Sequence, residues 1–322
     1  MRNFLLLSLI FLGMFSCKNN AKSVVDVSDV SDVSVNFATK RFEVDFYNST
    51  EKTLSETKKN YPFLFPKGIH DSVWIRKIND NDERALFEET QKVFQSTGKL
   101  EEALLSLFKH IKYYLPNFLA PNVITVQTNI DYDHRVIYAD SLLLISLDSY
   151  LGTTHEFYND YPKYVKQNNT KEHLIVDVAN AIIKKQLKPS LNRVFLYKMI
   201  YEGKKMYLLD AYLPAVSDKE KIGYAAEKFQ WTLNNEEEIW KYFIENDLLY
   251  DTDTKLNQRF LDIAPFSKFY LGEDNKSPGQ IGIWVGWQIV RSFMRNNDVS
   301  LQQLLQMREE EIFKKSKYKP RR

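Results

Sequence analysis

Cysteine is almost absent from this 322-residue chain, which has only one, Cys17. A lone cysteine cannot form an intrachain disulfide, and it cannot supply the paired thiolates of a structural zinc site. Glycine and proline are also scarce, with ten of each. Low numbers of both residues are typical of a body built mainly from helices and argue against a loop-rich chain.

An excess of one charge is also missing. The chain has 44 basic and 42 acidic residues, so its formal net charge is only +2. This balance gives no global electrostatic reason to bind nucleic acid, and we predict no nucleic-acid partner. Hydrophobic residues make up 44% of the sequence, which at this length is enough to bury a large core.

No hydrophobic run at the N-terminus is long enough to span a bilayer. The apolar stretch 4–15, which follows Arg2, falls short of the ~20 apolar residues that a transmembrane helix needs. Its position and length are typical of a signal peptide, which we place at residues 1–16. Cys17 follows Gly13-Met14-Phe15-Ser16, a string that resembles a bacterial lipobox in the relaxed form found in Bacteroidetes.

The lipobox-like string predicts cleavage after Ser16 and attachment of a diacylglycerol and an N-acyl chain, such as palmitate, to Cys17. Each buried methylene of an acyl chain contributes ~0.8 kcal/mol, so two or more chains anchor a protein stably. The predicted location is therefore the cell envelope, on a membrane and facing the periplasm. An ordinary secretory signal followed by an incidental cysteine is the alternative.

The segment after the cysteine is low in complexity and contains the run VVDVSDVSDVSV. Its small, polar composition predicts a solvated tether over residues 17–35. Residues 36–322 contain no linker long enough to mark a domain boundary, so we predict one globular domain there.

Apolar periodicity predicts an α-rich α+β fold. Strands are expected at 36–47, 122–127, 135–140 and 142–148, and they could form a small mixed sheet. Helices are expected at 51–60, 72–78, 83–94, 99–115, 170–188, 191–213, 225–246, 279–295 and 300–314. The aromatic, proline-bounded loop 61–68 is expected to pack against another part of the body.

The stretch 277–294 is apolar on most sides, which predicts a helix buried in the middle of the domain. Ser277 is expected to cap this helix and Pro278 to occupy its first turn. Gly282 and Gly286 lie four residues apart. Glycine costs a helix about 1 kcal/mol relative to alanine, so we expect another backbone to approach closely at this pair.

Three segments contain residues that could suggest a metal site, and each has a simpler structural interpretation. His155-Glu156-Phe157-Tyr158-Asn159 lacks the second histidine of an HExxH zinc motif. His173 has no second histidine nearby and is expected to be exposed or to cap a helix. The 251–256 segment lacks the later ligands of a calcium loop, so a turn capped by its aspartates is expected. We therefore predict no metal and no cofactor.

Two charged runs have equally simple interpretations. The acidic run 236–238 is expected to form a solvated helix face, with its charges favoured by the helix dipole if a helix begins near residue 234. The basic tail 314–322 could contact anionic lipid or a partner, but a frayed terminus is the expectation for a domain end.

Several long strings together resemble the GldB family of gliding motility lipoproteins from Bacteroidetes. They are YPFLFP (61–66) with DSVW (71–74), LFKHIKYY (107–114), VIYADSLLL (136–144), APFSKFY (264–270) and GWQIVRS (286–292). The resemblance implies a lipid-anchored envelope protein required for gliding, with other gliding proteins and the associated type IX secretion machinery as partners. Cys17 is the one residue to which the family assigns a role, and a non-enzymatic role is implied.

A second, fainter likeness is to a family of predicted zinc peptidases. It rests on Tyr201-Glu202-Gly203 and on a Pro-Gly pair followed by Trp284-Val285-Gly286-Trp287. In that alignment Asp177 replaces the first histidine of HExxH, Val178 the glutamate and Ala181 the second histidine. Glu202 matches the third ligand. The likeness implies a degenerate zincin-like scaffold that acts as a binding module. The alternative is an envelope hydrolase in which Asp177 and Glu202 share a cleft.

Overall fold

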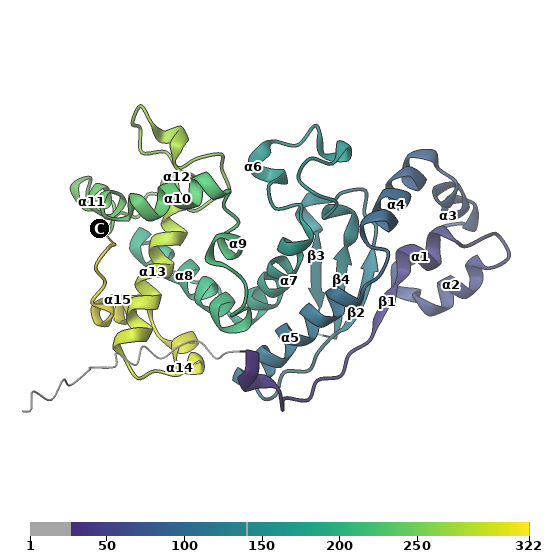
Figure 1. Ribbon diagram of the computed structural model, residues 1–322, viewed down its shortest axis with the longest axis horizontal. Helices are drawn as coiled ribbons and strands as arrows, with labels where there is room; N and C mark the ends of the chain where they lie inside the picture. The colour runs from purple at the N-terminus through teal and green to yellow at the C-terminus, as the bar shows by residue number, and fades with distance from the viewer. Residues whose placement is uncertain (1–26, 140, 322) are drawn as a thin grey trace, which may run out of the picture.

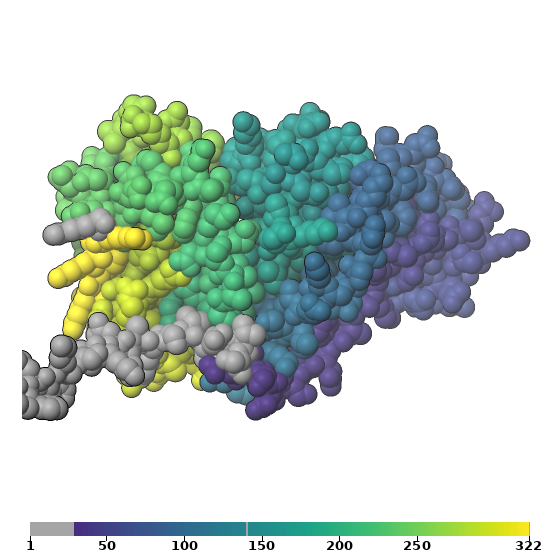
Figure 2. Space-filling model, viewed as in Figure 1, coloured from purple at the N-terminus to yellow at the C-terminus, as the bar shows by residue number. Residues whose placement is uncertain are grey.

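The computed structural model describes residues 27–139 and 141–321. The predicted signal peptide, Cys17 and the first part of the predicted tether lie outside these residues. The helices at the C-terminal end of the chain gather on one side, while the sheet and helices α1 to α4 form the other (Figure 1). The space-filling view shows these parts as one continuous body (Figure 2).

The predicted α-rich α+β class is confirmed, with one small sheet among many helices. The helices are α1 (Phe42–Tyr47), α2 (Leu54–Asn60), α3 (Asp71–Ile78), α4 (Asn81–Val93), α5 (Gly98–Tyr114), α6 (Lys163–Lys166), α7 (Lys171–Gln186), α8 (Phe195–Tyr212), α9 (Asp218–Ile222), α10 (Ala226–Asn234), α11 (Glu236–Glu245), α12 (Lys255–Phe260), α13 (Ile281–Asn296), α14 (Leu301–Gln306) and α15 (Glu309–Ser316). The strands are β1 (Thr39–Arg41), β2 (Asn122–Val126), β3 (Val136–Ala139) and β4 (Leu142–Ser146).

The sheet is mixed, as predicted, and its strand order is β1-β2-β4-β3. The β1-β2 and β2-β4 pairs are parallel, and β3 runs antiparallel to β4. Strand β2 lies in the interior of the sheet, and four of its five residues are buried. Helices α5 and α7 lie beside the sheet and help to separate it from the C-terminal helices (Figure 1).

The strand predicted over 36–47 is wrong for most of its length. Only Thr39–Arg41 pairs with β2, and the chain then forms helix α1. Phe42 and Phe46 stack at a centroid distance of 5.3 Å, because residues four apart share a helix face. Both rings pack in an aromatic cluster with Phe65, from the 61–68 loop that was expected to pack.

Helix α13 is the buried central helix that the sequence predicts, with ten of its sixteen residues buried. Its predicted start is wrong: the helix begins at Ile281, after Gln280 in a left-handed conformation (φ 60°). Ser277 caps nothing there. It is buried, and its hydroxyl donates to the carbonyl of Asp274 at 2.7 Å, which closes the preceding loop instead.

Helices α13 and α8 cross where Gly286 meets Gly203, as the glycine spacing indicated. A Cβ on Gly286 would lie 1.8 Å from the carbonyl oxygen of Met199, and one on Gly203 would lie 2.3 Å from the backbone of Gly286. The two backbones are therefore in direct contact, and any side chain at either position would separate them.

Two long predicted helices are each broken in two. The 225–246 segment forms α10 and α11 with a break at Asn235, whose side chain donates to the carbonyl of Trp231. The 300–314 segment forms α14 and α15. Its break leaves the Met307 carbonyl free to accept from the buried Lys204 ammonium at 3.1 Å, so a tertiary contact overrides the local helical pattern.

The last part of the predicted tether is packed rather than solvated. Val30 is 2% exposed, within a short 3-10 helix over Val27–Val30. Lys109 and Lys112 of α5 donate to the carbonyls of Ser31 and Ser34 at 2.8 and 3.0 Å. Residues 27–35 therefore lie against the body.

The prediction of a frayed tail is wrong, and the acidic run is solvated, as predicted, at Glu237 and Glu238 but not at Glu236. Glu236 is 5% exposed and accepts hydrogen bonds from the Tyr318 hydroxyl at 2.9 Å and the Arg321 amide at 3.1 Å. Its second oxygen accepts from the Trp284 indole at 3.1 Å. The tail is thus fixed to α11 and to the central helix. Within the described part of the chain, no helix combines the length and apolar character needed to cross a membrane.

Candidate functional site

A cleft of about 490 Å³ opens between helices α7 and α8. Residues from the loop before β3, from α9 and from the start of α13 complete its walls. Its polar lining comprises Tyr132, Asp133, Arg135, Asn168, His173, Asp177, Asn180, Lys184, Glu202, Lys205, Lys221 and Gln280. The structure therefore brings Asp177 and Glu202 into one cleft, as the hydrolase alternative requires.

Asp177 is held by three groups from three parts of the chain. Arg135 pairs with its carboxylate at 3.2 Å, and the Tyr150 hydroxyl donates to the same oxygen at 2.8 Å. The His173 ring lies one helical turn before it, with Nε2 at 3.5 Å from the other oxygen. Burial raises the pKa of Tyr150 well above its usual value, so this hydroxyl remains a donor. Asp177 is thus paired through one oxygen, and its other oxygen faces the His173 ring.

His173 is neither exposed nor a helix cap, contrary to the prediction. It is 5% exposed because α9, a helix that the sequence analysis missed, lies over α7. Glu220 of α9 contacts its Nδ1 at 2.8 Å. The hydrogen bond with His173 lowers the pKa of Glu220, so this side chain remains a carboxylate near neutral pH. The cap of α7 is Thr170 instead.

Glu202 is paired as well. Both of its carboxylate oxygens contact the Lys205 ammonium, at 2.7 and 2.8 Å, across one turn of α8. Ala181 lines the cleft one turn after Asp177, whereas Val178 is fully buried in the core. The positions that match the metal ligands of the peptidase-like family therefore line this cleft, but the side chains there are engaged with cations or are apolar.

The remaining metal suggestions do not form sites. His155 caps a 3-10 helix over Glu156–Tyr158 and lies 3.4 Å from Glu89. The expected turn at the 251–256 segment is confirmed, because Asp251 and Asp253 each accept an amide two residues ahead at 2.9 Å. Among residues 27–139 and 141–321, no group of three His, Cys, Asp or Glu side chains is arranged to hold a metal ion.

Two cavities of about 650 and 790 Å³ adjoin the cleft. Tyr132 and Gln280 line both the cleft and the first of these, and Asn168 lines all three. The lining of the two neighbours adds Tyr164, Lys163 and Tyr224. Tyrosine, amide and lysine side chains therefore line the cleft and both cavities, which together make up the groove.

One lip of the cleft depends on a buried carboxylate that the sequence analysis missed. Asp148 is 0% exposed and accepts the amides of Thr128 and Ile130 at 3.1 and 2.7 Å. Ile130 has φ 60°, a strained conformation for a β-branched residue. Burial raises the pKa of Asp148. This contact fixes the loop that carries Tyr132 to the edge of the cleft.

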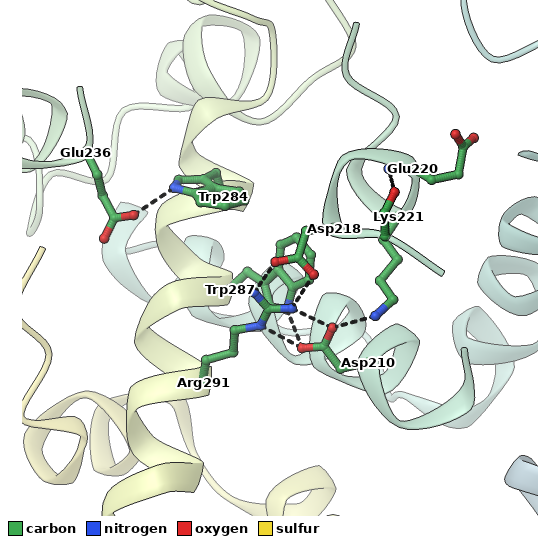
Figure 3. A network of polar contacts seen from close by, with 9 residues as sticks. Asp210, Asp218, Glu220, Lys221, Glu236, Trp284, Trp287 and Arg291 are labelled. Carbon is green, nitrogen blue, oxygen red and sulfur yellow. Dashed lines mark hydrogen bonds and ion pairs between the residues drawn. The ribbon is translucent and has the colours of Figure 1, made fainter. Parts of the chain in front are cut away.

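A buried ionic network adjoins the cleft through Lys221, which also lines the cleft (Figure 3). Asp210 of α8 accepts from Lys221 at 2.9 Å, from Arg291 at 2.7 Å and from the Trp287 indole at 2.8 Å. Arg291 also pairs with Asp218 at 2.6 Å. Burial opposes the charge on Arg291, but Asp218 and Asp210 raise its pKa overall. The network joins α8, α9 and α13.

Comparison with known proteins identifies the family. The model of a family described as gliding motility protein GldB matches residues 23–320, which is nearly the whole chain. No curated protein and no solved structure gave a significant match. The match covers the cleft, the ionic network and both groups of helices, and it agrees with the strings that suggested this family from the sequence. The chain belongs to the GldB family of gliding motility proteins.

Proposed function

We propose that this chain is a lipid-anchored, non-catalytic component of the gliding machinery, and that its cleft binds a segment of another gliding or type IX secretion protein. One observation carries the proposal: the carboxylates that a hydrolase would use in the cleft are already paired. Asp177 is engaged by Arg135 and Tyr150, and Glu202 is engaged by Lys205. A general base or a metal ligand needs a free lone pair directed at its target.

The volume of the groove supports a role in binding. The cleft and its neighbours are comparable in volume to pockets that hold ligands of several hundred Å³. Their tyrosine and amide side chains offer apolar faces and hydrogen bonds together, which suits an extended polypeptide.

The proposed anchor is Cys17, modified after removal of residues 1–16. Nine residues, 18–26, separate it from the first described residue. The ten Cα-to-Cα steps from Cys17 to Val27 span at most about 35 Å. The proposal therefore places Val27, the first described residue, within that distance of the membrane, with the body facing the periplasm, where other envelope proteins are accessible.

Two substitutions separate binding from catalysis. Glu202→Gln removes the carboxylate but keeps the shape of the cleft, so we expect gliding to continue at the rate of the parent strain. Ala225→Trp places an indole in the groove from an exposed position that lines both neighbouring cavities, so we expect gliding to be lost. Colony spreading and single-cell tracking measure both outcomes.

The matched control is Leu191→Trp, which adds an indole at a residue that is 95% exposed and outside the groove lining. It should glide normally. Protein level is checked by immunoblot for each strain. Loss of gliding in Glu202→Gln at normal protein level would contradict the non-catalytic proposal, as would stoichiometric zinc together with peptidase activity in the purified protein.

Replacing Cys17 with serine tests the anchor. Diacylglycerol attachment needs the thiol, so Cys17→Ser is expected to accumulate as unlipidated precursor and to lose labelling by a palmitate analogue completely. In-gel detection of the labelled lipid gives the result, with Ser16→Ala as the control, because a small residue there preserves the lipobox. Unchanged labelling of Cys17→Ser would refute lipidation at this residue.

A further inference from the structure

A second groove, of about 350 Å³, lies between helix α11 and the loop 261–280 that leads into α13. It shares no lining residue with the cleft or with the two cavities beside the cleft. The proposed function makes no use of it. Its apolar lining consists of Trp231, Ile239, Tyr242, Phe269 and Leu271.

The floor of this groove is rigid and aromatic. Phe269 is 6% exposed and packs edge-to-face on Tyr242, with ring centroids 5.0 Å apart. The Tyr242 hydroxyl donates to the Phe269 carbonyl at 2.5 Å and accepts from Arg259 at 3.1 Å. These contacts connect α11 to the loop, so the groove is formed before any partner arrives, which lowers the entropic cost of binding.

A strained turn at the rim exposes two large apolar side chains, of which Leu271 lines the groove. Tyr270 is 75% exposed and has φ 65°, a conformation that costs an L-residue about 1 kcal/mol or more. Leu271, beside it, is 61% exposed. The Asp274 carboxylate holds both residues by accepting their amides at 2.8 and 3.1 Å. The turn thus keeps two apolar groups in solvent that a relaxed loop would be free to bury.

The groove carries negative charge. Its lining includes the carboxylates of Glu238, Glu245, Glu273 and Asp274, against the single ammonium of Lys241. Lys241 lies 3.9 Å from Glu245, and Lys276 pairs with Glu273 at 2.6 Å, so lysine offsets two of the four carboxylates. With Lys276 counted, the four carboxylates and two ammonium groups give the rim a net charge of −2. An apolar floor inside this rim favours a ligand that is apolar at its centre and cationic at its ends.

We propose that this groove docks a segment of a partner protein in which a large apolar side chain is flanked by lysine or arginine. The apolar side chain packs on Phe269 and Leu271, and the flanking cations pair with the carboxylates of the rim. The negative charge of the groove favours this basic segment over two other possible occupants. A second copy of the chain would bring the same acidic groove to a two-fold contact, and an anionic membrane surface would be repelled.

A defined peptide probe tests the proposal on the full lipid-anchored chain, held in phosphatidylcholine nanodiscs. The probe is fluorescent Lys-Lys-Gly-Phe-Leu-Gly-Lys-Lys, and its acidic counterpart has glutamate in place of each lysine. Fluorescence anisotropy is expected to show binding of the basic peptide only, weakening as salt is raised. Leu271→Ser is expected to weaken binding about tenfold, as removal of a central apolar anchor does.

A charge swap supplies the decisive comparison. In the double variant Glu238→Lys, Glu245→Lys, preference is expected to invert, so that the acidic peptide binds and the basic one does not. Leu119→Ser and Glu102→Lys are matched controls on exposed residues outside the groove, and both should bind as the parent does. The proposal is overturned if the basic peptide fails to bind or if the double variant keeps its preference. It is also overturned if Leu271→Ser abolishes dimers, which would indicate a second copy as the occupant, or abolishes binding to phosphatidylglycerol vesicles, which would indicate a membrane surface.

Discussion

Replacing Asp210 with alanine is expected to lower the free energy of unfolding by about 3–5 kcal/mol. Asp210 is 3% exposed and is the acceptor for Lys221, Arg291 and the Trp287 indole. Its removal leaves Lys221, itself 6% exposed, without its carboxylate, while Arg291 keeps Asp218. A buried cation without its partner retains the full desolvation cost, which is why one substitution has so large an effect.

Urea denaturation followed by tryptophan fluorescence measures this loss, since Trp287 is part of the network. Asp262→Ala is the matched control: the same change at an exposed aspartate of the loop before α13, where a shift within about 0.5 kcal/mol is expected. If Asp210→Ala unfolds at the urea concentration of the parent protein, the network does not hold α8, α9 and α13 together, and the wall of the cleft at Lys221 must have another support.

The parts of the fold that the sequence predicted are those set by local periodicity. Helices such as α5 and α7 have an apolar stripe with a polar opposite face, and their ends were predicted within two residues. The three strands 122–127, 135–140 and 142–148 follow one another at short intervals, so a small mixed sheet could be predicted, but not that β2 pairs in parallel with β4 and has no pairing with β3. The paired glycines of α13 also carried information, because glycine in a helix interior needs a reason.

The errors arise where distant contacts override local preference. Phe42, Val44 and Phe46 alternate as a strand would, but Phe42 and Phe46 also lie on one helix face, and an aromatic cluster far along the chain selects the helix. Glu236 sits in an acidic run that looks solvated. Only the fold shows that Tyr318, 82 residues later, returns to bury it.

At the candidate site too, local sequence predicted some features and distant contacts determined the others. Asp177 and Glu202 were named from a family likeness, and the structure places both in one cleft. Of their partners, Lys205 could be expected from its i+3 spacing to Glu202 on a helix. Arg135 and Tyr150, which engage Asp177, come from the sheet region and have no local signal. Local sequence therefore suggested carboxylates, and only tertiary structure showed that they are paired.

The last prediction concerns the crossing of α8 and α13. Gly286→Ala is expected to destabilise the protein by about 3 kcal/mol, because the new Cβ would lie 1.8 Å from the Met199 carbonyl oxygen and only movement of a helix backbone can relieve that contact. The sign of this change in stability is informative. In an uncrowded helix the same change would stabilise by about 1 kcal/mol, so helix propensity alone predicts the opposite result.

Gly272→Ala is the matched control, since a Cβ there meets nothing within 4 Å and no effect from crowding is expected. Thermal unfolding followed by circular dichroism compares the three proteins. A neutral or stabilised Gly286→Ala would contradict direct backbone contact at the crossing. The consequence reaches the cleft, because Gly203 at this crossing is the neighbour of Glu202. An α8 displaced by the added methyl would shift one wall of the groove, so loss of stability and loss of partner binding should occur together in this variant.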